Sequence, residues 1–347
     1  MNTCSIGFDV AALDETSYAE QVAHLFHTNH HARTVSADQF GEIGTLAAMF
    51  DEPFADASAL PTWRVSQLAR ETVTVALSGD GADEAFAGYR RQVFHAHEET
   101  ARRWLPDGFR QSVLGGLGAV YPKADWAPRS LRLKTTLLAL AGSGSEGYAR
   151  ALSITPPELR RPLYNADFAR QIGDYRAEDS FIRLMDGAPA RSGLDRAQYA
   201  DLNFWLPGDI LTKVDRTSMA VSLEAREPLL DHRLIEFAAG LPEGLRVRGR
   251  QGKVLLKRAM RRYLPENVLY RPKQGFVTPI ADWLRGPLSG EARAIAKNAA
   301  LARTGWFDPA RVSAAAETHL SGRSDHSRLL WQLIMLDRSL RHLGVVS

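Results

Sequence analysis

The chain has 347 residues, of which 45% are apolar and 24% are charged, and its formal net charge is +3. This length and composition are enough to bury a sizeable core, favour two domains over one and argue against disorder. The small positive excess, without a long Lys/Arg block, suits a small anionic ligand, and we expect no nucleic-acid partner. Cys4 is the only cysteine and no apolar run reaches about 18 residues, which predicts a cytoplasmic protein without a disulfide or a membrane segment.

The first ninety residues alternate between strand and helix patterns. The patterns predict strands at Thr3–Phe8, His31–Val35 and 73–77, and helices at Ser17–Phe26, Phe40–Phe50 and a segment ending near Arg70. Such alternation is typical of a parallel sheet covered by helices on both faces. The mostly apolar strand at 73–77 should be buried, and ligands of such sheets bind beyond the carboxyl ends of the strands.

From about residue 95 onward the patterns are helical, without a convincing series of strands. The segment 327–343 should pack on the rest of the chain because its leucines have helical spacing: Leu329, Leu330, Leu333, Leu336 and Leu340. We therefore expect two regions, an α/β region at 1–95 and a mostly helical region at 96–347.

Directly after the third strand, the segment "LSGDGADEAFAGY" at 77–89 holds three acids, Asp80, Asp83 and Glu84. Two carboxylates ~4 Å apart repel by about 4 kcal/mol at an effective dielectric of 20, so the cluster requires a cation or basic partners. Mg²⁺ prefers such oxygen ligands and often bridges to phosphates, which favours metal binding for Asp80 and Asp83. For Glu84 a second interpretation is open, in which the acid begins a helix and complements its dipole.

The same turn offers hydrogen-bond donors to phosphate oxygens. The hydroxyl of Ser78 and the backbone amides of Gly79 and Gly81 can face phosphate or pyrophosphate. Gly81 and Gly88 do not have the spacing of a dinucleotide fingerprint, which excludes NAD as the cofactor.

Two more segments concentrate charge. Residues 203–231 alternate in sign, and ion pairs between helices account for most of these side chains: Lys213, Asp215, Arg216, Glu224, Arg226, Glu227 and Asp231. In "GRQGKVLLKRAMRR" at 249–262, Lys253 begins a predicted helix, where a cation is unfavourable unless an anion lies nearby. Lys257, one turn later, fits a solvated basic face equally well. The pair His30 and His31 lacks a third ligand at useful spacing, so we expect no metal there.

Six segments together resemble a known family. They are "SIGFD" at 5–9, "DEPFADASALP" at 51–61, "LSGDGADEAFAGY" at 77–89, "LTKVDRTSMAVSLEAREPLLD" at 211–231, "GKVLLKRAM" at 252–260 and "RPKQGFVTP" at 271–279. In this order they resemble the synthetase domain of the glutamine-dependent asparagine synthetase family, and the resemblance covers essentially the whole chain.

The resemblance implies an α/β fold with a parallel sheet of the ATP-pyrophosphatase type (adenine nucleotide alpha hydrolase-like) in the N-terminal part, here incomplete, followed by a mostly helical region that completes the site. It also implies chemistry on ATP with Mg²⁺. In this family the β-carboxylate of aspartate attacks the α-phosphate, which gives an acyl-adenylate and pyrophosphate. Ammonia then displaces AMP and forms the amide.

Residue roles follow from the resemblance by position. It implies that Asp80 and Lys253 are catalytic, Lys253 by neutralising charge on the α-phosphate, and that Asp83 binds Mg²⁺. Contacts to ATP are implied for Ile6, Ser78, Gly79 and Gly81. A supporting role around the site is implied for Asp215, Arg216, Glu224 and Arg226.

The sequence departs from the family pattern in two ways. An earlier strand that ends in a Ser-Gly-Gly-x-Asp-Ser pyrophosphate loop does not occur, and neither does the N-terminal glutaminase domain, whose cysteine nucleophile would occupy the position of Asn2. We therefore expect no glutaminase activity and weak adenylation from this chain alone, as for a truncated gene model or a split gene. The expected partners are a small carboxylate substrate, ammonia and a separate glutaminase subunit or N-terminal part, and a homodimer is compatible with the sequence.

Two alternatives remain open. The chain is an amide ligase of the same family that acts on another carboxylate in a secondary or envelope pathway, or it is a non-catalytic binding module that keeps the fold. The presence of Asp80, Asp83 and Lys253 together argues against the second alternative, because a site without function has no reason to hold all three.

Overall fold

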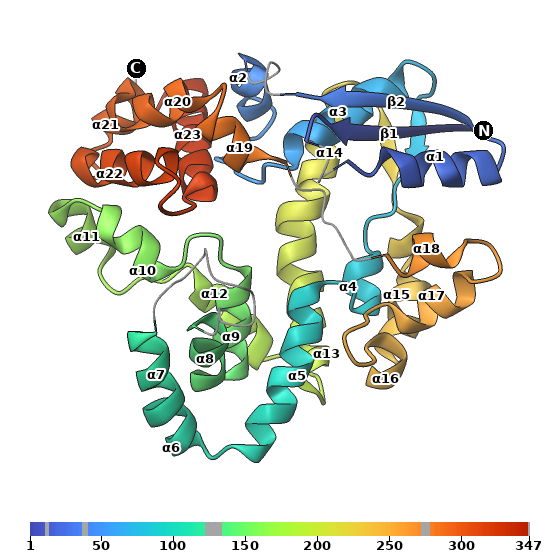
Figure 1. Ribbon diagram of the computed structural model, residues 1–347, viewed down its shortest axis with the longest axis horizontal. Coiled ribbons are helices and arrows are strands. Elements are labelled where there is room, and N and C mark those ends of the chain that lie inside the picture. The colour runs from blue at the N-terminus through green and yellow to red at the C-terminus, as the bar shows by residue number, and fades with distance from the viewer. Residues whose placement is uncertain (11–13, 37–40, 122–133, 272–277, 346–347) are drawn as a thin grey trace.

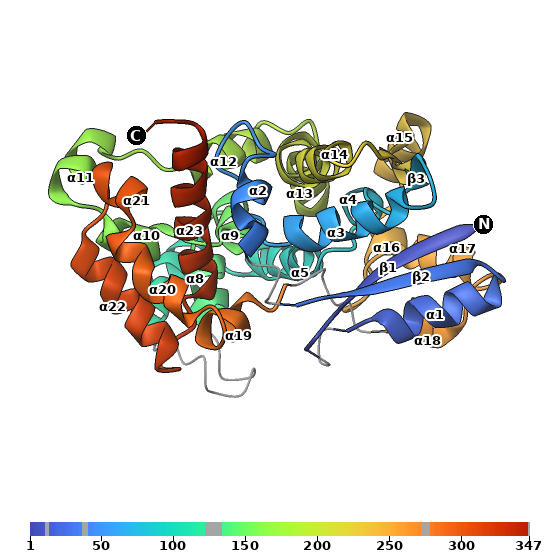
Figure 2. The same ribbon diagram turned by 90° about the horizontal axis from the view of Figure 1, so that it is seen from above.

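A two-stranded parallel sheet forms near the N-terminus. The computed structural model describes residues 1–10, 14–36, 41–121, 134–271 and 278–345. β1 (Asn2–Phe8) pairs in parallel with β2 (Asn29–Val35). α1 (Thr16–Leu25) packs on one face of this sheet and α3 (Ala59–Arg70) on the other, as Figure 2 shows. The predicted parallel pairing and the helical cover of both faces are confirmed for these two strands.

A second parallel sheet joins distant parts of the chain. β3 (Val75–Leu77) pairs with β4 (Glu224–Arg226), a strand that the sequence pattern did not predict. The expectation that the strand at 73–77 is buried was wrong, since 40% of Val75 and 75% of Leu77 is exposed. Among the described residues β3 pairs with β4 alone, so its other edge and the Leu77 side chain stay open to solvent.

Short helices make up most of the remaining structure. α2 (Ile43–Ala47) is shorter than the predicted helix at 40–50, and Phe40 lies outside the described residues. The acidic turn leads into α4 (Ala82–Phe86). The helices after it are α5 (Arg90–Trp104), α6 (Asp107–Phe109), α7 (Gly115–Val120), α8 (Lys134–Ala141), α9 (Gly144–Leu152), α10 (Pro157–Arg160), α11 (Ala166–Ile172), α12 (Glu178–Asp186), α13 (Gly193–Ala200), α14 (Thr212–Met219), α15 (His232–Ala239), α16 (Glu243–Arg246), α17 (Val254–Met260), α18 (Glu266–Leu269), α19 (Ile280–Arg285), α20 (Ser289–Ala294), α21 (Ala299–Arg303), α22 (Pro309–Leu320) and α23 (Ser327–His342).

One long helical column runs through the centre of the molecule. α13, a π-helix at Asp201–Leu211 and α14 follow one another without a break. In Figure 1 this column passes beside α5 and reaches α3 at its upper end. π-Helical segments are uncommon and often occur at functional sites. We name residues 193–219 the central column.

The largest apolar core joins the two ends of the chain. Leu46 in α2 and Leu60 in α3 belong to the same buried cluster as Leu330 and Ile334 in α23, and all four are fully buried. Figures 1 and 2 both show α2 beside α23. The predicted packing of the C-terminal leucines is confirmed, whereas the division of the chain at residue 95 stays a prediction. Within the described ranges, no helix is both long and apolar enough to cross a membrane.

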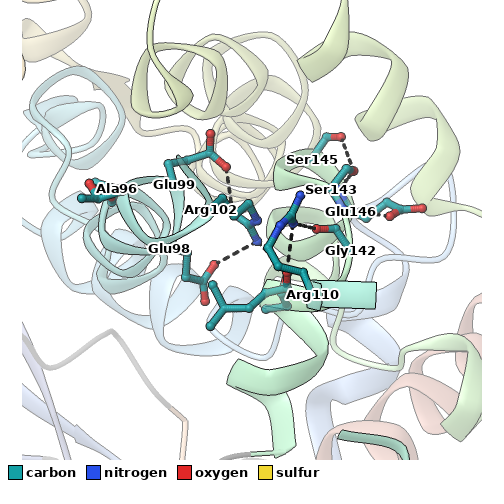
Figure 3. Close-up of polar contacts among 12 residues, drawn as sticks. Ala96, Glu98, Glu99, Arg102, Arg110, Gly142, Ser143, Ser145 and Glu146 are labelled. Carbon is teal, nitrogen blue, oxygen red and sulfur yellow. Dashed lines mark hydrogen bonds and ion pairs between the residues drawn. The ribbon is translucent and has the colours of Figure 1, made fainter. Parts of the chain in front are cut away.

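Two arginines connect α5 and the segment after α6 to α8. Arg102 of α5 lies 2.8 Å from Glu99 of the same helix and donates a hydrogen bond of 2.6 Å to the carbonyl oxygen of Ala139 in α8. Arg110, directly after α6, donates hydrogen bonds of 3.0 Å to the carbonyl oxygens of both Leu140 and Gly142 (Figure 3). The carbonyl groups of the last helical turn have no partner within their own helix. Arg110 therefore supplies donors to the end of α8 from another part of the chain.

Candidate active site

The acidic turn follows β3 directly, as the sequence predicts. Gly81 precedes α4 with φ of 90°, a backbone conformation that suits glycine, and a Cβ at this position would overlap the side chain of Leu230. A Cβ at Gly79 would instead meet open space. The turn is therefore fixed at Gly81 and open at Gly79, which leaves room for a ligand beside the backbone of Gly79.

The three acids of the turn do not share one partner. Asp80 accepts a hydrogen bond from the hydroxyl of Ser78. Asp83 Oδ1 lies 3.1 Å from Nζ of Lys253. Glu84 is almost fully buried and accepts a hydrogen bond of 2.6 Å from the Tyr89 hydroxyl. Burial raises the pKa of Glu84, and the hydrogen bond from Tyr89 offsets this only in part. Each acid thus has its own partner, although the charge of Asp83 still raises the pKa of Glu84.

The described part of the chain contains no group of three or more His, Cys, Asp or Glu side chains arranged to hold a metal ion. Mg²⁺ often takes only one or two carboxylates and completes its shell with water and substrate phosphates. Asp83, about one-fifth exposed and beside the Gly79 backbone turn, fits one such ligand. Glu84 does not, because its carboxylate is buried against Tyr89.

Lys253 reaches the turn through an unusual backbone conformation. It precedes α17 with φ of 57°, in the left-handed region, and its N–H donates a hydrogen bond of 3.0 Å to the carbonyl oxygen of Phe86. Ala87, on the other side of this contact, also has a positive φ of 55°. Non-glycine residues in this region store strain and cluster at functional sites. The close approach needs two glycines, since a Cβ at Gly88 would overlap Asp83 and Lys253, and one at Gly252 would overlap the carbonyl oxygen of Ala87.

A second cation lies on the central column near the turn. Lys213 is 8% exposed, and its Nζ donates hydrogen bonds of 2.8 Å to Asp56 Oδ2 and to the hydroxyl of Ser58. Burial alone would lower the pKa of Lys213, but the charges of Asp56 and Asp209 raise it above its usual value. The charge of Asp80 also raises the pKa of Lys213. The acidic turn therefore lies within electrostatic reach of the Lys213–Asp56 pair.

Asp209 is an acid of this neighbourhood whose pKa is strongly raised. It belongs to the π-helix Asp201–Leu211, and burial together with the charge of Asp56 raises its pKa to about 7. The positive charge of Lys213 lowers the pKa of Asp209 but does not cancel the effects of burial and Asp56. The negative charge of Glu84 raises this pKa further. Acids whose pKa is shifted by burial and by specific neighbours in this way are candidates for function.

The segment at 224–231 meets the turn through β4. The N–H of Ser78 donates a hydrogen bond of 2.8 Å to the carbonyl oxygen of Arg226. Glu224 and Arg226 form an exposed ion pair with each other at 2.7 Å. Burial raises the pKa of the next residue, Glu227, and the charges of Asp80 and Asp215 raise it further.

Two residues that the family resemblance assigns to the site, Arg216 and Ile6, lie away from the acidic turn. The exposed side chain of Arg216 pairs with Asp51, so it connects α14 to the segment at 51–61. Ile6 lies in the other sheet, in β1, where it lines a cavity of about 500 Å³ with Tyr18 and Val22 of α1. The structure therefore gathers Ser78, Asp80, Asp83, Glu224, Arg226 and Lys253 around one turn but does not place Ile6 or Arg216 in that cluster.

The structure gives partners for several other basic side chains. Lys257 lies over the ring of Tyr270 at 5.6 Å, and Arg271 pairs with Glu15. His30 hydrogen-bonds to the hydroxyls of Thr3 and Ser5, at 2.9 and 3.0 Å. Lys273 lies outside the described residues.

Sequence reasoning missed Asp56 and Asp209, and it assigned Lys213 to an ion-pair network without a place in the site. Asp56 and Lys213 are 157 residues apart, so no local spacing relates them. Asp56 and Lys213 each lie inside one of the segments quoted above, and Asp209 lies in the charged stretch 203–231, which was the available signal. The structure joins these segments pairwise, through Asp56 and Lys213, and through Asp83 and Lys253.

Comparison with known proteins decides which family these segments represent. The asparagine synthase family profile matches residues 1–341. The chain belongs to the asparagine synthase family. Glutamine-hydrolyzing asparagine synthetase 1 of Bacillus subtilis is 29% identical over 339 residues, covering 96% of this chain and 51% of that protein.

Two further relatives extend the comparison. A protein of Mycobacterium bovis that carries the same enzyme name provisionally is 33% identical over 338 residues, covering 96% of this chain and 49% of its own length. Amidase chyE of Penicillium rubens is 22% identical over 340 residues, covering 89% of this chain and 48% of its own length. The chain thus spans about half the length of the curated relatives it matches.

Proposed function

We propose that this chain carries the carboxylate-activating site of an ATP-dependent amide ligase of the asparagine synthetase type, in an N-terminal part of the ATP-pyrophosphatase type. The observation that supports it best is the convergence on one turn of Asp80, Asp83 and Lys253. Lys213 and Asp56 lie within electrostatic reach of the same turn. Membership of the asparagine synthase family supports ATP as the co-substrate.

The proposed reaction has two steps. A carboxylate oxygen of the substrate, aspartate, attacks the α-phosphorus of ATP, and the bond from that phosphorus to the bridging oxygen breaks to release pyrophosphate. Ammonia then attacks the acyl carbon of the adenylate, loses a proton and displaces AMP, which leaves the amide. Both steps move negative charge onto phosphate oxygens.

The residues of the turn suit these charge movements. Lys253, held at the turn by its backbone hydrogen bond to Phe86, brings a cation to the charge that develops on the α-phosphate. Ser78 and the amides of Gly79 and Gly81 provide donors to phosphate oxygens. Asp83 would hold Mg²⁺, which supplies charge neutralisation for pyrophosphate when it is bound. Asp80, which acts electrostatically on Lys213 and Glu227, would orient the acyl group in this proposal.

We further propose that the ammonia comes from a glutaminase part or partner, as the names of the longer relatives suggest. Asp215, Glu224 and Arg226 support the turn rather than contact substrate in this proposal, because Arg226 acts through its backbone and all three side chains are exposed. Ile6 is proposed to contact adenine from β1.

The test is pyrophosphate release that depends on both ATP and aspartate, with ammonium chloride as the nitrogen source. Lys253→Met should lower kcat by about 100-fold or more, the usual effect of removing one preorganised charge at a transition state, and change KM for ATP far less. Lys257→Met is the matched control, since Lys257 is on the same helix but lies over Tyr270. It should keep activity within about twofold.

Equal losses in kcat/KM from the two lysine variants would contradict the proposed role of Lys253. Release that depends on a carboxylate other than aspartate would keep the ligase and replace its substrate. Calorimetry that detects no binding of Mg-ATP to the full chain would favour the non-catalytic alternative.

A further inference from the structure

One side chain of the central column hydrogen-bonds to α4, the helix that carries Asp83. α4 has only five residues, Ala82–Phe86, so its carbonyl groups lack partners within a longer helix. Gln198 of α13 donates hydrogen bonds from Nε2 to the carbonyl oxygens of Glu84 and Ala85, at 2.6 and 3.0 Å. Gln198 is 5% exposed, so these bonds are shielded from water.

The amide of Gln198 is itself fixed by a buried charge. Its Oε1 accepts a hydrogen bond of 2.5 Å from Nη1 of Arg246, which is 3% exposed. The other arm of that guanidinium pairs with Asp195, also on α13. Since Arg246 can only donate, it sets the amide of Gln198 with oxygen toward the guanidinium and the NH₂ group toward α4. The orientation of the Gln198 amide therefore follows from the fact that a guanidinium group has no hydrogen-bond acceptor.

Backbone hydrogen bonds connect α4 to Gly88 and to Lys253, one of the candidate catalytic residues. The N–H of Gly88 donates to the carbonyl oxygen of Asp83 at 2.9 Å, and the N–H of Lys253 donates to that of Phe86 at 3.0 Å. The carbonyl oxygen of Asp83 also accepts the N–H of Ala87 at the end of the helix, whereas the next three carbonyl groups, at residues 84–86, accept hydrogen bonds from distant parts of the chain. Gln198 provides the partner for the first two of these three.

We propose that Gln198 is a positioning residue that, oriented by Arg246, holds α4 so that Asp83 and Lys253 keep their geometry. Gln198 acts through the backbone and touches no substrate. The effect on catalysis rests on the function proposed above, whereas the effect on the geometry of α4 does not.

The experiment replaces the amide by an apolar group of similar size, Gln198→Leu. Gln198 and Arg246 line a cavity of about 560 Å³, so leucine has room and its effect will come from the lost hydrogen bonds. We expect backbone hydrogen exchange at Gly88 and Lys253 to accelerate about tenfold, because the carbonyl groups that accept from them lie on α4, which has lost its hydrogen bonds from Gln198. We also expect kcat for pyrophosphate release to fall about tenfold or more with KM for ATP changed less.

Arg110→Met is the matched control, since it removes a buried donor from two carbonyl groups at the end of α8 instead of α4. It should leave exchange at Gly88 and Lys253 and the value of kcat unchanged. Gln198→Glu is a second variant that keeps the acceptor for Arg246 but turns oxygen toward the α4 carbonyl groups, and it should reproduce the defect of Gln198→Leu.

Exchange at Gly88 and Lys253 that stays unchanged in Gln198→Leu, or that rises equally in Arg110→Met, would overturn the positioning role. A wild-type chain without pyrophosphate release would refute the proposed function alone. The exchange measurement would then still decide whether Gln198 positions α4.

Discussion

At the scale of single residues, the buried and half-buried acids near the turn set the electrostatic character of the candidate site. Asp56 and Asp209 both interact with one lysine, Lys213, and the charge of Glu84 acts on Asp209, so each pKa reflects burial and the charges nearby. Asp56 keeps a pKa below its usual value because Lys213 outweighs the effect of burial. For Asp209, burial and the charge of Asp56 outweigh the charges of Lys213 and Arg91, which explains why its pKa moves the opposite way.

The raised pKa of Asp209 predicts a defined dependence of stability on pH. The folded protein holds this proton up to about pH 7, whereas an unfolded aspartic acid releases it near pH 3.8. Between these values the folded state binds more protons, so this group makes the fold less stable as the pH rises, and the full cost is present above pH 7. Asp209→Asn should therefore raise the free energy of unfolding at pH 8 by about 2 kcal/mol or more, and little near pH 4.

Urea unfolding of the variant at both pH values measures this difference. Asp215→Asn is the control, because Asp215 is an exposed acid on the next helix and should change stability by less than about 0.5 kcal/mol at either pH. A gain for Asp209→Asn of the same size at pH 4 and pH 8 would exclude titration of Asp209 as its cause.

At the scale of elements, short pieces of structure derive their positions from contacts across the chain. The central column contacts α5 and α9 through Asp201, which accepts hydrogen bonds from Gln92 of α5 and Tyr148 of α9 at 2.8 and 2.6 Å. It contacts α4 through Gln198 and the segment before α3 through Lys213. The column thereby fixes the placement of α4 relative to Asp56 in the candidate site.

Exposure of β3 predicts that its leucine contributes little to stability. Leu77 is 75% exposed, whereas Leu60 of α3 is fully buried in the main core. Leu77→Ala should change the free energy of unfolding by less than about 0.5 kcal/mol, and Leu60→Ala should lower it by about 2–5 kcal/mol. Thermal and chemical unfolding of the two variants make the comparison. A large loss for Leu77→Ala would mean that β3 is covered in solution.

Apart from β3, which was predicted from its apolar run, the elements that sequence reasoning predicted are those with enough residues to show a period. β1 and α1 begin and end within two residues of the predicted limits, and so does the end of α3 at Arg70. β4 has three residues and no local signal, because it is defined by its pairing with β3. The acidic turn was predictable from its composition, and its charged partners from the quoted segments. The pairing of Asp56 with Lys213 was not, since it depends on the fold.

At the scale of the whole molecule, the main core makes the first and last parts of the chain depend on each other. α2 packs against α23, and the cluster continues through α3 to β1. A smaller cluster lies apart, around Phe181 and Met185 of α12. The molecule therefore contains regions whose local stabilities should respond to different substitutions.

Ile334→Ala tests this dependence. Ile334 is fully buried in α23, and its truncation should cost about 2–5 kcal/mol. Because the same core contains Ile6 and Phe8, amides of β1 and β2 should lose protection from hydrogen exchange together with those of α23. Met185→Ala, in the smaller cluster, is the control and should mainly affect α9 and α12. Unchanged exchange in β1 and β2 after Ile334→Ala would show that the two ends unfold separately.

Gly88 and Gly252, where the backbone near Ala87 contacts the backbone near Lys253, should differ in how well they tolerate substitution. A side chain at Gly252 meets a backbone carbonyl, which no substitution elsewhere can remove, so replacement there would be selected against whether or not the protein is active. A side chain at Gly88 meets the flexible ends of Asp83 and Lys253. A folded but inactive chain can therefore accept alanine at position 88, and a library screened for folding alone would enrich variants at position 88 while position 252 stays invariant.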